Sequence, residues 1–199
     1  MTWSATARYG TDAAPGQLAF VHDFLSTAPV GHPALTDLLD DLGPAQSWLD
    51  EAVRARGADP AEVKLGSDDL APLKRLRSAL LTSLDGEADV TTSAPSAKLS
   101  ISLDANGSVQ LDGEGGAAAR LTATLLRDVY DAQQQGTWRR LKACRNPSCR
   151  IVFFDRSKNN SRVWDDLATC GNREHLRTFR ARQRAMESEG DAGSLTPDR

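Results

Sequence analysis

The sequence predicts an α+β fold, in which a mostly helical N-terminal domain with one β-hairpin precedes a small cysteine-containing module that ends in a basic helix. Three observations lead to this prediction. Leucine-rich segments recur at helical spacing through the first two thirds of the chain, one short stretch alternates apolar and polar residues, and the three cysteines all lie between positions 144 and 170. We therefore expect a helical domain over 9–136, a cysteine module over 137–186 and a disordered tail over 187–199.

The composition is typical of a globular protein of the cell interior. Of the 199 residues, 40% are hydrophobic, which is enough to bury a core, and there is no apolar run of 18 residues that would suggest a membrane span. We expect a cytoplasmic location and no membrane association. Three cysteines in a reducing compartment argue against a disulfide framework, which leaves metal binding, redox chemistry or burial as their uses.

Apolar side chains recur at the spacing of a helix in five segments of the first domain. These segments are 16–26, 36–43, 44–57, 67–86 and about 117–135. Thr36 and Ser67 are placed to cap their helices. Gly43 is placed to stop one helix and Pro44 to open the next. We expect the first segment to be an amphipathic helix with its apolar side in the core.

Between the fourth and fifth helices, apolar and polar residues alternate on both sides of Asn106-Gly107. The alternating apolar residues are Leu99, Ile101, Leu103, Val109 and Leu111. Asn-Gly accepts the positive φ angles of the primed turns that join two strands, so the stretch predicts a β-hairpin with such a turn.

Charge is distributed unevenly along the chain. Residues 141–185 carry 11 Lys and Arg against 4 Asp and Glu, a net charge of +7, whereas the rest of the chain has 13 basic and 23 acidic residues, a net charge of −10. The whole chain therefore has a formal charge of only −3. A basic segment inside an acidic protein suggests a polyanionic partner for that segment alone, although a solvated charged surface is the simpler alternative.

The three cysteines and one aspartate have a repeated spacing. Cys144-x4-Cys149 encloses an Asn-Pro turn, and Asp165-x4-Cys170 has the same length. A strand over 150–154 and a polar turn over 155–162 separate the two pairs, which is how a zinc ribbon is built. The spacing predicts a zinc-ribbon-like module that holds one Zn²⁺ per chain.

The fourth ligand of such a site has alternatives. A carboxylate oxygen can ligate zinc, so Asp165 fits chemically, but it retains the ion less firmly than a thiolate does. His175 is the competing fourth ligand, and Asp166 is a third candidate. A module without metal, held together by its apolar residues, is the remaining alternative.

The same run of residues resembles a known family. The elements that carry the resemblance are the Trp-x-x-Leu-Lys sequence at 138–142, the Cys-x4-Cys pair, the Asp-x-Ser-x-Asn-x-Ser turn at 155–161, Trp164, and Cys-Gly-Asn-Arg at 170–173 followed by basic residues. This segment is similar to the CGNR zinc-finger module. Residues 9–136 resemble, more loosely, the ABATE domain that usually precedes this finger.

The resemblance implies that Cys144, Cys149 and Cys170 are zinc ligands. The family has a cysteine directly after the tryptophan, where this chain has Asp165. The resemblance also implies a transcription regulator, in some relatives induced by stress, that binds DNA through the finger.

Basic residues after Cys170 fall on one side of a predicted helix. At 100° per residue, four arginines lie within about 60° of one another. They are Arg173, Arg177, Arg180 and Arg184, and Lys158 and Arg162 in the preceding turn can extend the patch. Asn172 is suited to cap this helix, and Leu176, Phe179 and Met186 form an apolar edge that can dock on the zinc module.

Four aligned arginines repel one another unless an anion neutralises them, and a phosphate backbone does so while releasing counterions. We therefore expect DNA as the partner. RNA binding and a protein-interaction adaptor remain as alternatives. A small-molecule effector of the N-terminal domain and a homodimer are further expectations that no particular residue cluster supports.

An enzyme with a catalytic zinc, in which Asp165 would act as the base, is the rival from another class of protein. The sequence has no His-Glu-x-x-His pattern, no nucleophile elbow and no partnered histidine, and thiolate-rich zinc sites are usually structural. We therefore expect no enzymatic activity.

Overall fold

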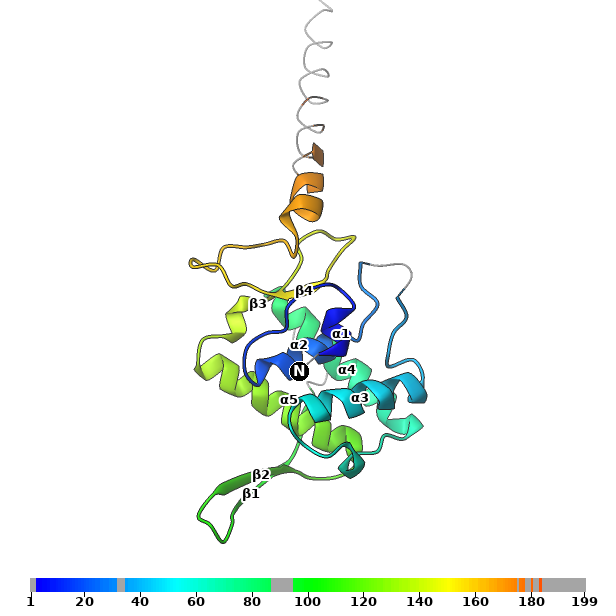
Figure 1. Cartoon of the computed structure of the whole chain (residues 1–199), viewed down its shortest axis with the longest axis vertical. Coiled ribbons are helices and arrows are strands. Elements are labelled where there is room, and N and C mark those ends of the chain that lie inside the picture. The colour runs from blue at the N-terminus through cyan, green and yellow to red at the C-terminus, as the bar shows by residue number, and fades with distance from the viewer. Residues whose placement is uncertain are drawn as a thin grey trace, which may run out of the picture.

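A computed structural model describes residues 3–31, 35–86, 95–174, 176, 177, 180 and 183. In chain order, the helices are α1 (Ser4–Ala7), α2 (Leu18–Leu25), α3 (Leu42–Ala55), α4 (Ser67–Leu84) and α5 (Ala117–Gln134). The strands form two antiparallel pairs, β1 (Leu99–Leu103) with β2 (Val109–Gly113) and β3 (Leu141–Ala143) with β4 (Val152–Phe154). The predicted α+β class is thus confirmed, and Figure 1 shows the helices as one body with the first hairpin and the cysteine region at opposite ends.

Helix α2 lies at the centre of the helical body. All eight of its residues are buried, so it is a fully enclosed helix and not the amphipathic one that its apolar spacing predicts. Its buried carboxylate, Asp23, accepts hydrogen bonds from the Thr6 amide at 2.7 Å and from the Trp48 indole at 2.8 Å. Because these partners lie on α1 and α3, the carboxylate ties three helices together.

The helical body and the second hairpin share one hydrophobic core. Leu141 of β3 and Val152 of β4 belong to the same cluster of buried residues as Phe24 and Leu125, and Trp138 and Phe154 pack against that cluster. The short hairpin is therefore seated on the helices by apolar contacts of its own. This packing fixes the position of everything that β3 and β4 carry.

Three of the five predicted helical segments match α2, α4 and α5 closely, and a fourth matches most of α3. In the segment 36–43, residues 38–41 instead form a turn, because the Asp37 carboxylate accepts a hydrogen bond from the Leu39 amide at 2.8 Å and closes the chain on itself. Helix α3 accordingly begins at Leu42, with Gly43 inside its first turn, and α4 is preceded by Gly66 and not capped by Ser67.

The predicted hairpin is present, but its turn differs from the expected primed type. The register pairs Leu103 with Val109, so five residues form the loop, and Gly107 has a positive φ of 79°. Asp104 organises the loop by accepting hydrogen bonds from the amides of Asn106 and Ser108. The Asn-Gly pair therefore marks the hairpin correctly, while the aspartate before it determines the loop.

Across the described residues, the longest helices are too short or too polar to span a bilayer.

Candidate metal centre and basic helix

The first cysteine pair lies on the loop that joins β3 to β4. The Cys144 amide donates to the Ile151 carbonyl at 2.8 Å, which closes the loop, and the Cys149 amide donates to the Asn146 carbonyl at 2.9 Å. Arg150 has a φ of 60°, a left-handed backbone that turns the chain from the loop into β4. The two thiols therefore face the same space from either end of a tight loop.

The polar turn that follows β4 is built around the buried Asp155. Its carboxylate accepts hydrogen bonds at 2.8 Å from the Lys142 ammonium and from the amides of Ser157 and Arg162. Burial alone would raise the pKa of Asp155, but these hydrogen bonds outweigh burial and hold the pKa well below its usual range. Lys142 also donates to the carbonyls of Asn160 and Arg162, so this ion pair determines the path of the turn.

Of the second pair, Cys170 lies on a short helical turn, Leu167–Gly171, that adopts π geometry, and Asp165 lies just before this turn. Asp166 precedes this turn, and its side chain accepts a hydrogen bond from the Thr169 amide at 3.0 Å. Asp166 is thereby used as a cap, whereas Asn172 has helical φ and ψ angles and does not cap the helix as expected. A Cβ on Gly171 would lie 2.6 Å from Leu167 Cδ1, so a larger residue there would require the exposed Leu167 side chain to move.

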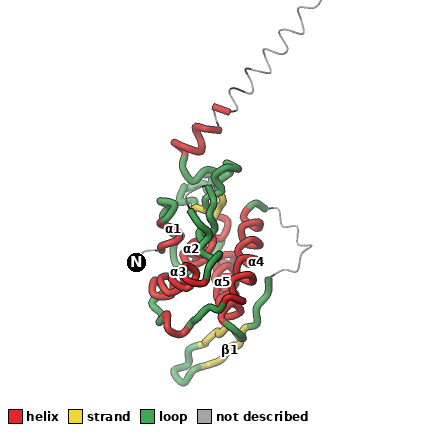
Figure 2. The backbone as a smooth tube through the Cα atoms, turned by 90° about the vertical axis from the view of Figure 1, so that its right-hand side faces the viewer, coloured by secondary structure: helices red, strands yellow, loops and turns green. Residues whose placement is uncertain are grey.

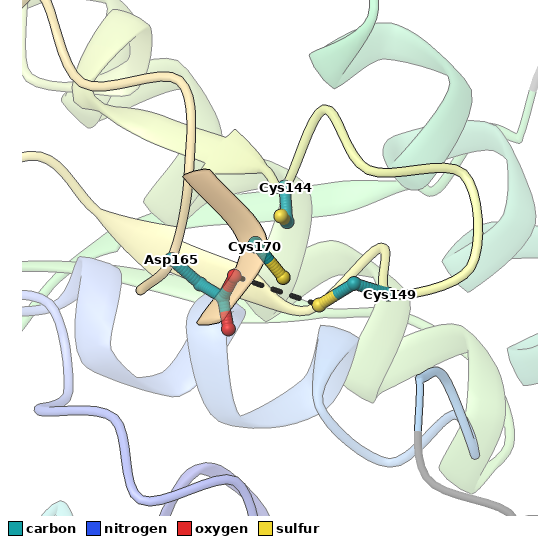
Figure 3. Close-up of side chains that lie close together, drawn as sticks. All are labelled: Cys144, Cys149, Asp165 and Cys170. Carbon is teal, nitrogen blue, oxygen red and sulfur yellow. Dashed lines mark hydrogen bonds between the residues drawn. The ribbon is translucent and has the colours of Figure 1, made fainter. Parts of the chain in front are cut away.

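The two pairs converge on one point, as Figure 3 shows. The ligand atoms of Cys144, Cys149, Asp165 and Cys170 all lie within 4.8 Å of one another, and the three cysteines are buried. A zinc ion with sulfur ligands at about 2.3 Å in tetrahedral geometry separates those sulfurs by about 3.8 Å. The cluster needs only a small contraction to reach that geometry, and its donor set of three thiolates and one carboxylate fits zinc.

The electrostatics of the cluster also favour a cation. Burial, followed by the nearby Asp165 carboxylate, raises the pKa of Cys144 to about 11. The pKa of Cys149 is raised further, first by burial and then by the charges of Asp165 and Cys144. Cys149 Sγ and Asp165 Oδ1 are 3.5 Å apart. A divalent ion offsets the repulsion among these closely spaced, buried negative groups, because it stabilises the thiolates and the carboxylate together.

Asn146 supports the cluster in a way that the sequence pattern does not predict. Its side chain is buried, donates from Nδ2 to Cys170 Sγ at 3.4 Å, and accepts from the Ser148 amide at 3.1 Å. Such an outer hydrogen bond orients a ligand and tunes its basicity. The Asn-Pro pair in the first loop predicts a turn, but not that this amide reaches across to the second pair.

The first cysteine loop contacts the helical body directly. His22 of α2 accepts a hydrogen bond from the Ala14 amide at Nδ1, so its Nε2 carries the proton and donates to the Val152 carbonyl at 2.9 Å. Gly31 approaches so closely that a Cβ there would lie 2.4 Å from the Cys149 carbonyl oxygen. An ion pair between Arg150 and Asp85 of the helical body adds a charged contact.

The predicted basic residues are exposed wherever the structure describes them. Lys158 and Arg162 lie in the polar turn, and Arg162 also stacks over the Phe153 ring and donates to the Asp165 carbonyl. Arg173, Arg177 and Arg180 lie on the helix that follows Gly171.

That helix is described at residues 172–174, 176, 177, 180 and 183, and Figure 2 shows its first turns leaving the body of the protein. Leu176 is 54% exposed, so at this position the expected docking of an apolar edge on the zinc module is wrong. Arg177 forms an ion pair with Glu174 one turn earlier. His175, Phe179, Arg184, Met186 and the tail 187–199 lie outside the described residues.

The fold and the cluster define a small metal-binding module of two cysteine-containing loops, seated on a helical body. The family model described as the CGNR zinc finger matches residues 140–183, which is the segment that contains both loops and the start of the basic helix. This match and the four-residue cluster are together consistent with one zinc ion. None of the curated proteins compared with the chain matches it significantly.

Proposed function

We propose that this protein is a DNA-binding transcription regulator whose zinc finger presents an arginine-rich helix to the phosphate backbone. One observation carries the proposal. Arg173, Arg177 and Arg180 are exposed on a helix that leaves the protein body, in a segment matched by a zinc-finger family. An α-helix that projects freely fits the width of the major groove, and its guanidinium groups neutralise phosphates.

The packing of the aromatic residues of the finger supports DNA, and not single-stranded RNA, as the proposed partner. Recognition of unpaired bases commonly uses exposed aromatic rings as stacking platforms. Phe153 is buried, Phe154 packs against the main core, and Trp164 packs against the cysteines. These three side chains are therefore engaged in holding the module together.

The zinc ion would have a structural role in this proposal. Three thiolates and the Asp165 carboxylate would fill a tetrahedral shell, and thiolate-rich closed sites are the structural class of zinc site. The ion would then fix the relative positions of the two loops, and with them the direction of the basic helix. The helical domain would carry the regulatory input, and no catalytic activity is proposed.

The identity of the fourth ligand can be tested by metal content. We expect one equivalent of zinc in the wild type and weaker retention in Asp165→Ala when both compete with a chromogenic chelator. Asp166→Ala is the matched control, because Asp166 hydrogen-bonds to the Thr169 amide and lies outside the cluster. Unchanged retention in Asp165→Ala combined with loss in His175→Ala would assign the fourth position to the histidine instead.

DNA binding can be tested by fluorescence anisotropy with duplex DNA over a range of salt concentrations. The double variant Arg177→Glu/Arg180→Glu should lower the affinity at least about tenfold and reduce the salt slope by about 2, since each arginine that contacts a phosphate contributes about one. Arg54→Glu/Arg120→Glu is the control, with the same charge change at exposed positions of α3 and α5.

Three outcomes would contradict the proposal. The first is a wild type that binds no duplex at low salt, the second is an equal loss of affinity in the two double variants, and the third is single-stranded RNA that competes better than the duplex does. The last result would indicate an RNA-binding protein, and the first would favour a protein-interaction adaptor.

A further inference from the structure

The β1–β2 hairpin has one covered edge and one open edge. On the β2 side, α5 approaches so closely that a Cβ on Gly113 would lie 2.8 Å from the Arg120 Cα, and the Arg127 guanidinium donates to the Leu111 carbonyl at 3.4 Å. On the other side, every residue of β1 is exposed, and Figure 1 shows the hairpin extending beyond the helices. A two-stranded hairpin is only marginally stable in water by itself. The unpaired backbone groups along an open edge can form hydrogen bonds with a further strand, which would stabilise the hairpin.

The register determines which backbone groups β1 leaves unpaired. The Asp104 amide donates to the Ser108 carbonyl and the Glu114 amide donates to the Lys98 carbonyl, so the hydrogen-bonded pairs of the hairpin are those of the even-numbered β1 residues. The amides and carbonyls of the odd-numbered residues consequently point outward. These residues are Leu99, Ile101 and Leu103.

The same three residues carry large exposed apolar side chains. Ile101 is 71% exposed, Leu103 69% and Leu99 41%. On β2, Val109 lies opposite Leu103 on the same face and is 59% exposed. The other face of the hairpin is polar. β1 thus lacks the lysine, proline or bulge within the strand with which proteins usually protect an open edge.

We propose that the open edge of β1 pairs antiparallel with β1 of a second copy of this chain, in a register centred on Ile101. The strand reads Leu-Ser-Ile-Ser-Leu, the same in both directions, so a two-fold axis at Ile101 places every residue opposite its own type. Leu99 faces Leu103 of the partner subunit, and the outward amides and carbonyls of both strands meet as hydrogen-bonded pairs.

The charges at the two ends of the strand match in this register. Lys98 precedes β1 and Asp104 follows it, and both are equally distant from Ile101. The two-fold axis therefore sets Lys98 opposite Asp104 of the partner subunit, and repeats the pair on the other side. Opposite charges across a strand pair stabilise it, whereas a parallel arrangement would set each lysine beside another lysine. This complementarity favours a second copy over an unrelated peptide.

The dimer would form one sheet with strand order β2, β1, β1, β2. It leaves the zinc finger free, because the finger and the hairpin lie at opposite ends of the molecule in Figure 1. It also depends on neither the metal nor the arginines, so the dimer should persist in the Arg177→Glu/Arg180→Glu variant even if that variant loses DNA.

The two-fold position of Ile101 allows a decisive experiment by sedimentation velocity over a wide range of protein concentration. We expect the wild type to dimerise, and Ile101→Lys and Ile101→Glu each to raise the dimer dissociation constant at least about tenfold, because each variant sets two like charges opposite one another. An equimolar mixture of the two variants should dimerise again, since lysine then faces glutamate. Both variants should stay folded, as Ile101 is largely exposed.

The control is Val109→Lys, which changes the same apolar face on the strand away from the open edge. It should change the dissociation constant less than about threefold under edge pairing. A wild type that stays monomeric, a mixture that fails to associate, or equal weakening by Val109→Lys and Ile101→Lys would each overturn the proposal. The last result would indicate stacking of the two apolar faces in place of strand pairing.

Discussion

Buried His22 links the helical body to the zinc finger, and its ionisation provides a quantitative test of that link. The imidazole accepts from the Ala14 amide at Nδ1 and donates to the Val152 carbonyl from Nε2. A second proton would have to enter at Nδ1, where it would remove the bond to Ala14 and place a charge in the core. Burial therefore lowers the pKa of His22 from 6.5 to about 4, against a smaller opposite effect of the Val152 carbonyl.

The direction of the pH effect follows from this lowered pKa. The unfolded chain takes up a proton at His22 near pH 6.5, whereas the folded chain does so only near pH 4. The contribution of neutral His22 to the unfolding free energy is therefore fully present above pH 6.5. It falls as the pH decreases through the window between the two pKa values. Because one pKa unit corresponds to about 1.4 kcal/mol, the full loss is about 3 kcal/mol, and about 1 kcal/mol of it occurs between pH 7 and pH 5.5.

The assay is urea unfolding of the wild type and of His22→Gln at pH 7 and at pH 5.5. Glutamine can keep the donor to Val152 but does not titrate, so the variant should be less stable at pH 7 and should lack the His22 contribution to the pH dependence. The difference in unfolding free energy should narrow by about 1 kcal/mol at pH 5.5. Protonation of zinc ligands affects both proteins and cancels in the difference. Equal pH dependence in the two proteins would refute the assigned burial and tautomer.

Three further predictions concern contacts that hold the finger in place. Gly31→Ala should destabilise the protein by about 2 kcal/mol more than Gly10→Ala, as measured by thermal unfolding of the two variants. Both glycines have a φ near 65°, but only Gly31 lies against the Cys149 carbonyl. Asp155→Asn should cost about 3 kcal/mol in urea unfolding, whereas exposed Asp112→Asn should cost less than about 0.5 kcal/mol. Chelation of the metal should accelerate amide exchange in the Leu167–Gly171 turn more than in β4, whose residues pack on the main core.

The convergence of the four side chains of the cluster could be predicted from the sequence, because it follows from the spacing of residues that lie near one another in the chain. Equal spacing in Cys144-x4-Cys149 and Asp165-x4-Cys170, with a strand and a polar turn between them, leaves few ways to arrange four ligands, and the structure brings those four side chains together. The long helices were predictable for the same reason, since leucine periodicity is a property of adjacent turns.

Contacts between distant residues were not predictable in this way. The hydrogen bond between His22 and Val152 joins positions 130 residues apart, and neither residue belongs to a pattern that indicates a partner. The approach of Gly31 to Cys149 depends on where two loops meet in the folded chain. Tertiary packing also overrode local signals. The apolar spacing of α2 suggests one buried side, but its central position buries all of it.

The uneven charge of the sequence has two different uses in the folded protein. Some basic residues of the finger face the acidic helical body, since Arg150 pairs with Asp85 and Arg156 donates to the Ala13 carbonyl at 2.7 Å. Together with the packing of β3 and β4 on the main core, these contacts hold the hairpin of the finger against the body. The rest of the chain carries a net charge of −10, which on balance opposes the approach of a polyanion to that part of the protein. If the protein binds DNA as proposed above, attraction would act mainly at the exposed arginines of the helix, and the duplex would meet that side of the protein first.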